Sequence, residues 1–253
     1  MTHQPQIPHI IHYCWFGHGP LPDSAKKCIA SWQRFFPDYE IKEWNENNFD
    51  VNICRYTSQA YAAKKYAFVS DYARFHVLYN HGGLYFDTDV EVTADFSDIL
   101  SVGPFMGYET DPDAMRMPYG TVNPGLGLGA YAGMDIYKKM LDHYNTLDFV
   151  DKDGIQVSGT VVFHATEVLK ENGLKPLSVP QTVCGVTVYG SEYFNPLNDA
   201  TGELCATRAT HSIHWYAKTW TGLSPIRIRI SRLSHRIFGL SFSARIKQLL
   251  HIR

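Results

Sequence analysis

Three acidic residues alternate along one short stretch of the chain. Residues 82–92 read GGLYFDTDVEV, with Asp87, Asp89 and Glu91 on every second position. Successive side chains of a β-strand point to opposite faces, so the pattern predicts a strand with one apolar face and one face that carries three carboxylates. A solvated outer face is the commoner explanation of a single Asp-x-Asp. A cation site therefore needs further groups close by.

An acid and a guanidinium precede this stretch on a predicted helix. Residues 59–80 have a helical period that ends at Gly82 and Gly83, and Asp71 and Arg74 share one face of it. An isolated pair of this kind is most often a surface ion pair that contributes little. Because the acidic strand follows at once, we expect the pair to border the same crevice as the acids of the strand.

Such a crevice predicts a cation and a phosphate group as its ligands. Two carboxylates two residues apart repel each other, and a hard divalent cation with oxygen ligands relieves that repulsion. If the cation carries a diphosphate, Arg74 gains a partner as well.

The flanking elements predict an α/β fold. Strands are expected over residues 7–13 and 39–44, joined by a helix that begins at Asp23 or Ser24. The short connections indicate a βαβ unit and a Rossmann-like, mostly parallel central sheet flanked by helices. Residues 93–129 are dense in Gly and Pro and are predicted to form long irregular connections.

The second half of the chain continues the pattern. Helices are predicted from about residue 134 to 144 and from 161 to 172, followed by short strands between 177 and 189. Ser158 to Thr160 read as a helix N-terminal cap or as a substrate contact.

The composition is that of an ordinary soluble globular protein, with 45% hydrophobic residues in 253. The absence of an apolar run of eighteen residues and of a signal-peptide pattern predicts a cytoplasmic location. The five cysteines are scattered and form no Cys-x-x-Cys pair. This argues against a disulfide framework or a zinc site and favours reduced, mostly buried thiols.

Three motifs in order resemble a known family. AFVSDYARFHVLYNHGGLYFDTDVEV closely resembles the signature of the DXD-motif sugar-binding glycosyltransferases, glycosyltransferase family 32, which are retaining hexosyltransferases with a GT-A fold. IPHIIHYCWFG is similar to the first strand and Trp loop of that family, and HSIHWYAKTW to its closing motif. The resemblance runs from Ile7 to Trp220 and implies a GT-A domain over residues 1–225.

The resemblance also implies roles for individual residues. Asp87, Asp89 and His214 would hold Mn²⁺ or Mg²⁺ against the diphosphate of a UDP- or GDP-linked sugar, and Trp15 would stack on the base. The implied catalytic residues are Asp71, Arg74, Asp87 and Asp89. The implied donor-binding residues are Trp15, Asp71, Arg74, Tyr85, Asp87, Asn123, Lys218, Thr219 and Trp220.

The closing motif departs from the family pattern at two positions. Trp215 stands where a second His is common, which leaves the contact of that His in doubt, and Thr219 replaces a Ser but keeps the hydroxyl. A satisfied core histidine stays the lesser alternative for His214 even with the resemblance. Without the resemblance, Trp15 and Trp220 are as readily interpreted as packing residues at the rim of a core.

The implied reaction is the transfer of a hexose to a glycan or lipid-linked oligosaccharide, in the biosynthesis of a bacterial capsule or lipopolysaccharide. The expected route to retention is front-face attack, in which the acceptor proton passes to the leaving phosphate oxygen. No nucleic acid is expected as a partner.

The C-terminal segment has a different charge from the rest. Residues 1–203 hold 14 basic and 25 acidic residues, a net charge of −11, whereas residues 204–253 hold nine basic residues and no acid. Residues 226–253 outline a basic amphipathic helix with an apolar stripe of Ile226, Ile230, Leu233, Ile237 and Leu240. Two interpretations stay open: the helix docks on the acidic domain, or it binds an anionic membrane surface and makes the protein peripheral to the inner face of the cell membrane.

Two other functions compete with glycosyl transfer. A phosphatase of the haloacid dehalogenase type also places an Asp-x-Asp at a strand end, and it would need Lys170 or Lys175 together with a later acidic pair that the sequence lacks. A non-catalytic sugar-binding relative is the other alternative, and a donor-hydrolysis assay would discriminate it.

Overall fold

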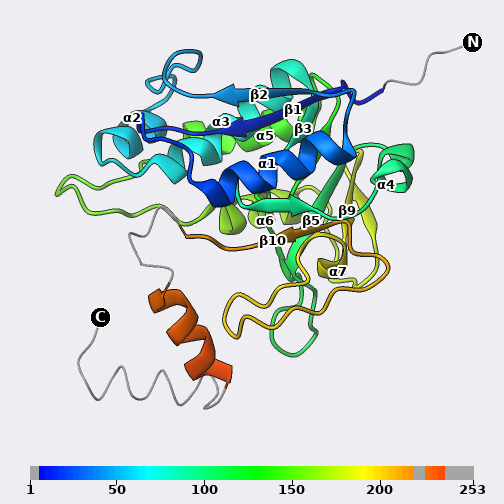
Figure 1. The fold of residues 1–253 in the computed structure, drawn as a ribbon. Coiled ribbons are helices and arrows are strands. Elements are labelled where there is room, and N and C mark those ends of the chain that lie inside the picture. The colour runs from blue at the N-terminus through cyan, green and yellow to red at the C-terminus, as the bar shows by residue number, and fades with distance from the viewer. Residues whose placement is uncertain (1–5, 219–225, 237–253) are drawn as a thin grey trace, which may run out of the picture.

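A mixed β-sheet lies between two layers of helices in the computed structural model, which describes residues 6–218 and 226–236 (Figure 1). In spatial order the strands are β2 (Glu40–Trp44), β1 (Ile10–Cys14), β3 (Gly83–Tyr85), β7 (Leu128–Ala130), β5 (Phe105–Thr110), β9 (Val186–Tyr189) and β8 (Gln181–Val183), with β6 (Thr121–Val122) paired to β5. The pairings give β2, β1, β3, β5 and β9 one common direction, and β6, β7 and β8 the reverse. The predicted α/β fold with a mostly parallel sheet is confirmed.

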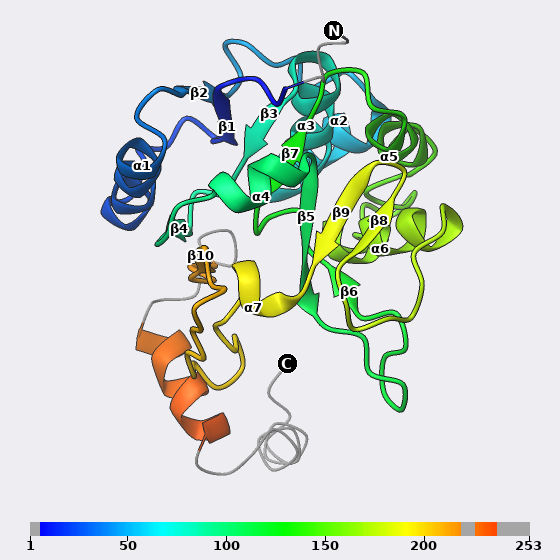
Figure 2. The ribbon, with the colours of Figure 1, turned by 90° about the vertical axis from the view of Figure 1, so that its right-hand side faces the viewer.

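Apolar side chains cover both faces of the sheet. One layer holds α2 (Arg55–Ala62), α3 (Tyr66–His81), α5 (Asp135–Asn145) and α6 (Val161–Glu171), whose buried residues form the larger core cluster. The other layer holds α1 (Asp23–Phe35), α4 (Ser97–Val102) and α7 (Ser191–Phe194), which pack on Phe86 and Phe105 (Figure 2). Trp32 of α1 is fully buried there and donates its indole N–H to the carbonyl of Val90, 2.8 Å away.

The acidic stretch is not one continuous strand. Its first part, β3, belongs to the central sheet, but the chain turns at residues 86–89 and continues as β4 (Val90–Val92), which pairs antiparallel with β10 (Ser212–His214) in a separate two-stranded sheet. Phe86 and Val90 are both buried, so an apolar alternation persists across the turn although the strand does not. The predicted single acidic face is therefore wrong for Glu91, which reaches Trp215 instead.

Two other expectations needed correction. The helix predicted over residues 59–80 is two helices, α2 and α3, separated at Lys64, which has a left-handed φ of 58°. The stretch 93–129, expected to be irregular, contains α4 and the strands β5, β6 and β7. The short strand β7 lies between β3 and β5, where Gly129 admits the Phe105 ring, so its small residues serve close packing.

The remaining elements follow the sequence closely. The predicted stop of α3 is confirmed, because Gly82 has φ 65° and a Cβ there would lie 2.8 Å from the backbone nitrogen of Ala132. All five cysteines are free, but Cys184 and Cys205 are exposed, so the thiols are less buried than expected. A helix spans residues 226–236, and no helix in the described ranges is long and apolar enough to cross a membrane.

Candidate active site

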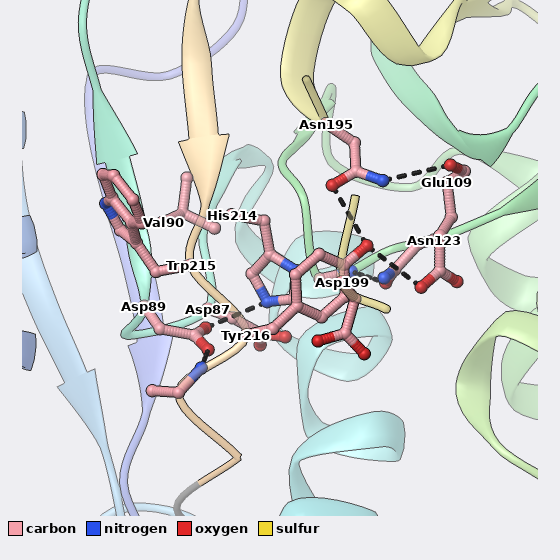
Figure 3. A network of polar contacts seen from close by, with 12 residues as sticks. Asp87, Asp89, Val90, Glu109, Asn123, Asn195, Asp199, His214, Trp215 and Tyr216 are labelled. Carbon is pink, nitrogen blue, oxygen red and sulfur yellow. Dashed lines mark hydrogen bonds and ion pairs between the residues drawn. The ribbon is translucent and has the colours of Figure 1, made fainter. Parts of the chain in front are cut away.

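The two aspartates of the DXD motif converge with a histidine from the far end of the domain. One ligand atom from each of Asp87, Asp89 and His214 lies within 4.8 Å of the others, and His214 Nε2 is 3.0 Å from Asp89 Oδ1 (Figure 3). Two carboxylates and one imidazole form a donor set that suits Mn²⁺ or Mg²⁺. The buried Nδ1 of His214 has no hydrogen-bond partner. The three residues implied as metal ligands thus fit a divalent ion.

The pairing of β4 with β10 assembles this cluster. Val90 lies opposite His214 and Val92 opposite Ser212 in the two-stranded sheet. The backbone N–H of Ala217 donates to Asp89 Oδ2 at 2.8 Å, so the segment after β10 holds the carboxylate as well. Residues 125 positions apart in the chain are thereby fixed side by side.

The charges at this cluster stabilise one another. Burial opposes ionisation of Asp89, but the attraction of His214 and its hydrogen bond, together with that of Ala217, outweigh burial and lower the pKa of the carboxyl. Burial likewise opposes the charge on His214, and the carboxylate of Asp89 outweighs it and raises the pKa of the imidazole. Each group therefore favours the charged form of the other.

Asp71 and Arg74 form a buried ion pair rather than a surface one. Arg74 Nη2 lies 3.0 Å from Asp71 Oδ1 and 3.4 Å from Asp87 Oδ1, and only 4% of the arginine side chain is exposed. Arg74 also lies over the ring of Tyr85, whose hydroxyl donates to Asp87 Oδ1 at 2.9 Å. Burial raises the pKa of Asp71 to about 7 against the opposing effect of Arg74. Asp71 and Asp87 thus share one guanidinium, and Asp89 lines the same cavity, so the three carboxylates and the arginine border one crevice as expected.

These groups line a cavity of about 700 Å³. Of the predicted donor-binding residues, Trp15, Asp71, Arg74, Asp87, Asn123 and Lys218 line it. Tyr85 does not line the cavity. It is 1% exposed and contacts Asp87 through the hydrogen bond from its hydroxyl. Thr219 and Trp220 lie outside the described residues.

Gly125 gives the Asp87 carboxylate its space. A Cβ at Gly125 would lie 2.2 Å from Asp87 Oδ2, and the backbone N–H of Gly125 donates to Asn123 Oδ1 at 2.7 Å. The Asn-Pro-Gly loop is therefore a wall against which the aspartate side chain rests.

Replacing Gly125 by Ala is expected to displace the Asp87 carboxylate from its present position and to weaken Mn²⁺ binding by at least about tenfold, with a small change in the free energy of unfolding. Isothermal titration with Mn²⁺ measures this. Gly190→Ala is the matched control, because a Cβ there meets only Asp111 Oδ1, at an ordinary 3.5 Å. Equal Mn²⁺ affinity in both variants would show that Asp87 does not need this space.

A second polar cluster in the cavity was missed from the sequence. Glu109, at the end of β5, accepts a hydrogen bond from the hydroxyl of Tyr216 at 3.1 Å, and Asn195 donates to the Glu109 carbonyl at 3.0 Å (Figure 3). Tyr216 packs against His214, with 4.2 Å between ring centroids, and has a left-handed φ of 51°. Burial raises the pKa of Glu109. The cluster gives the cavity a second acidic wall, joined to the DXD wall through Tyr216.

Two further residues close this wall. Asp199 lines the cavity and pairs with Lys218 at 2.7 Å. No sequence pattern singled out Asp199, which lies in a loop, whereas Tyr216 stood within the closing motif without an assigned role. Lys170 and Lys175, which a phosphatase would need, do not line the cavity; Lys170 pairs with Glu167 at 2.7 Å instead.

Residues 22–105 match the family model described as the glycosyltransferase sugar-binding region containing the DXD motif. Among curated proteins, the chain is 31% identical over 108 residues to an uncharacterized glycosyltransferase of Acanthamoeba polyphaga mimivirus, covering 39% of this chain and 42% of that one. It is 25% identical over 118 residues to inositol phosphoceramide mannosyltransferase 1 of Schizosaccharomyces pombe, covering 42% and 35%. The chain thus matches less than half the length of either relative.

Among solved structures, the PaToxG glycosyltransferase superposes with a TM-score of 0.50 at 19% identity, covering 66% of this chain and 70% of that one. At this identity the likeness concerns the fold, and it agrees with the GT-A architecture expected from the sequence.

Proposed function

We propose that this chain, as a member of the DXD-motif glycosyltransferases, is a metal-dependent retaining hexosyltransferase. Its donor would be a UDP- or GDP-linked sugar. The observation that carries the proposal is the convergence of Asp87, Asp89 and His214 with the Asp71–Arg74 pair in one cavity. Membership of glycosyltransferase family 32 in particular is part of the proposal.

The cavity has the charges that a nucleotide sugar requires. Arg74, Lys64, Lys65 and Lys218 line it and supply positive charge for a diphosphate. Trp15 also lines the cavity, and its indole N–H donates to the Gly19 carbonyl at 2.6 Å, which fixes the ring on its loop. We assign to this ring the stacking of the nucleotide base.

Asp87, Asp89 and His214 would hold Mn²⁺ or Mg²⁺, which supplies Lewis acidity toward the leaving diphosphate. Asp71 would accept hydrogen bonds from sugar hydroxyls. Arg74 is fixed by its contacts with Asp71, Asp87 and the Ser70 carbonyl, so its remaining N–H groups are oriented before the donor arrives. The acceptor hydroxyl would attack from the side of the leaving group and pass its proton to the departing phosphate oxygen.

The proposed acceptor is a glycan or lipid-linked oligosaccharide in bacterial surface polysaccharide synthesis, either capsule or lipopolysaccharide. We place the protein in the cytoplasm, peripheral to the inner face of the cell membrane. The second acidic wall, formed by Glu109 and Asp199, is the part of the cavity that we assign to the acceptor hydroxyls.

A thermal-shift screen of nucleotide sugars with and without Mn²⁺ tests the proposal. A ligand that binds only the folded state raises the apparent stability, by about 2.7 kcal/mol at a hundred times its Kd. We expect one nucleotide sugar to raise the melting temperature when Mn²⁺ is present and to do so far less after chelation. No shift with any UDP- or GDP-sugar would contradict the proposal. Release of free sugar from the shifted donor then discriminates an enzyme from a non-catalytic relative.

A further inference from the structure

The helix over residues 226–236 rests on the domain through its polar side. Arg232 Nη2 lies 3.1 Å from Asp199 Oδ1, and Arg232 Nε donates to the Asp199 carbonyl at 3.1 Å. His235 Nδ1 is 2.9 Å from the carbonyl oxygen of Ala200. The side of the helix that faces the loop at residues 199–202 thus carries a cation and an imidazole, together with the half-buried Ile228.

The apolar stripe of the same helix points away from the domain. Ile226, Ile230 and Leu233 are 68%, 63% and 58% exposed. Their spacing of four and three residues places them on one side of an α-helix, opposite Arg232 and His235. When an amphipathic helix packs on a core, its apolar stripe is the buried side. In this helix the apolar stripe is the exposed side. Ile237 and Leu240, which would continue the stripe, lie outside the described residues.

Positive charge flanks the exposed stripe. Arg229 and Arg236 are exposed, and both fall on the shoulder between the stripe and the docked side when the helix is drawn at about 3.6 residues per turn. The sequence from residue 204 onward contains no acid that would neutralise them.

We propose that this exposed side, formed by Ile226, Ile230 and Leu233 with Arg229 and Arg236, docks on an anionic lipid bilayer. A narrow apolar stripe beside arginines matches the interface of such a bilayer, into which the apolar side chains dip while the guanidinium groups stay at the phosphates. Three side chains on an eleven-residue helix are too small an apolar area for a stable protein dimer. The positive charge of Arg229 and Arg236 complements lipid phosphates, which favours a bilayer over a second protein as the occupant.

The helix that carries the docking surface contacts a residue of the cavity wall through its other side. Asp199 receives Arg232 from the helix and Lys218 from the cavity wall, at 3.1 Å and 2.7 Å. Figure 1 shows the helix below the domain, beyond β10. This inference names the surface behind the proposed peripheral location, and its test needs no donor, so it can fail without affecting the transfer reaction.

Flotation of the full chain with lipid vesicles is the test. The wild type is expected to float with phosphatidylcholine vesicles that contain phosphatidylglycerol, and not with phosphatidylcholine alone. The double variant Ile230→Gln/Leu233→Gln should lower the bound fraction at least roughly tenfold. Arg229→Gln/Arg236→Gln should weaken binding and reduce its salt dependence. Ser231→Gln, exposed on the same helix but off the stripe, is the matched control.

All five altered side chains are exposed, so each variant should melt at the wild-type temperature. Undiminished flotation of Ile230→Gln/Leu233→Gln, or equal flotation with neutral vesicles, would overturn the inference. So would a dimer, seen by sedimentation, that the same double variant dissociates, because the stripe would then contact a second copy.

Discussion

Asp89→Asn is expected to reduce metal-dependent sugar transfer by at least about a thousandfold, because the metal's charge stabilisation is worth several kcal/mol and each 1.4 kcal/mol is a factor of ten. Asn preserves the shape of the side chain, and its oxygen can still accept the hydrogen bond from Ala217. The negative charge that faces His214 and the ion is what the substitution removes. Initial rates at saturating Mn²⁺ and donor measure the loss.

Glu91→Gln is the matched control for this variant. Glu91 belongs to the same alternating run but accepts a hydrogen bond from the Trp215 indole at 2.8 Å, outside the cluster, and a Gln oxygen can accept it too. We expect this control to transfer sugar at the wild-type rate. An Asp89→Asn enzyme that kept its rate, or a Glu91→Gln enzyme that lost it equally, would contradict the assignment.

Arg74→Met is expected to lower the free energy of unfolding by about 3–5 kcal/mol, because it leaves Asp71 and Asp87 without their shared cation. The whole Arg74 residue is only 3% exposed, so water does not replace the lost guanidinium. Denaturant unfolding at neutral pH measures the change. Asp71→Asn in the same background should restore part of the loss, since it removes the carboxylate left buried.

The chain contains a surface pair with the same spacing. Asp23 and Lys26 on α1 are also three residues apart, at 3.1 Å, but both side chains are largely exposed. Lys26→Met should therefore leave the unfolding midpoint unchanged. A loss for Arg74→Met no larger than for Lys26→Met would mean that burial does not make the inner pair important.

The local parts of the site were predictable from the sequence. Helical spacing placed Asp71 and Arg74 on one face, and the Gly pair marked the turn that leads to Asp87. His214 is different, because only its resemblance to a family motif singled it out. No local pattern could reveal that β10 pairs with β4, since that register depends on packing between segments more than a hundred residues apart.

What failed was decided by tertiary packing. The alternation of residues 82–92 suggested one strand because Phe86 and Val90 are apolar and evenly spaced, but they are buried on either side of a turn. The dense punctuation of residues 93–129 concealed β5, and with it the position of Glu109 at the carboxyl end of a strand parallel to β1. Ligand sites gather at that edge of such sheets, so recognising β5 would have pointed to Glu109.

The claim on which this account depends is that the DXD carboxylates and His214 hold a divalent ion that carries the donor's diphosphate. Pulsed electron–nuclear double resonance of Mn²⁺ with the full chain and UDP or GDP tests it most directly. The account predicts both a ³¹P coupling and a ¹⁴N coupling at one Mn²⁺, with the ¹⁴N signal lost in His214→Gln and both lost in Asp87→Asn/Asp89→Asn. A spectrum that is the same in the wild type and in the double variant would contradict it.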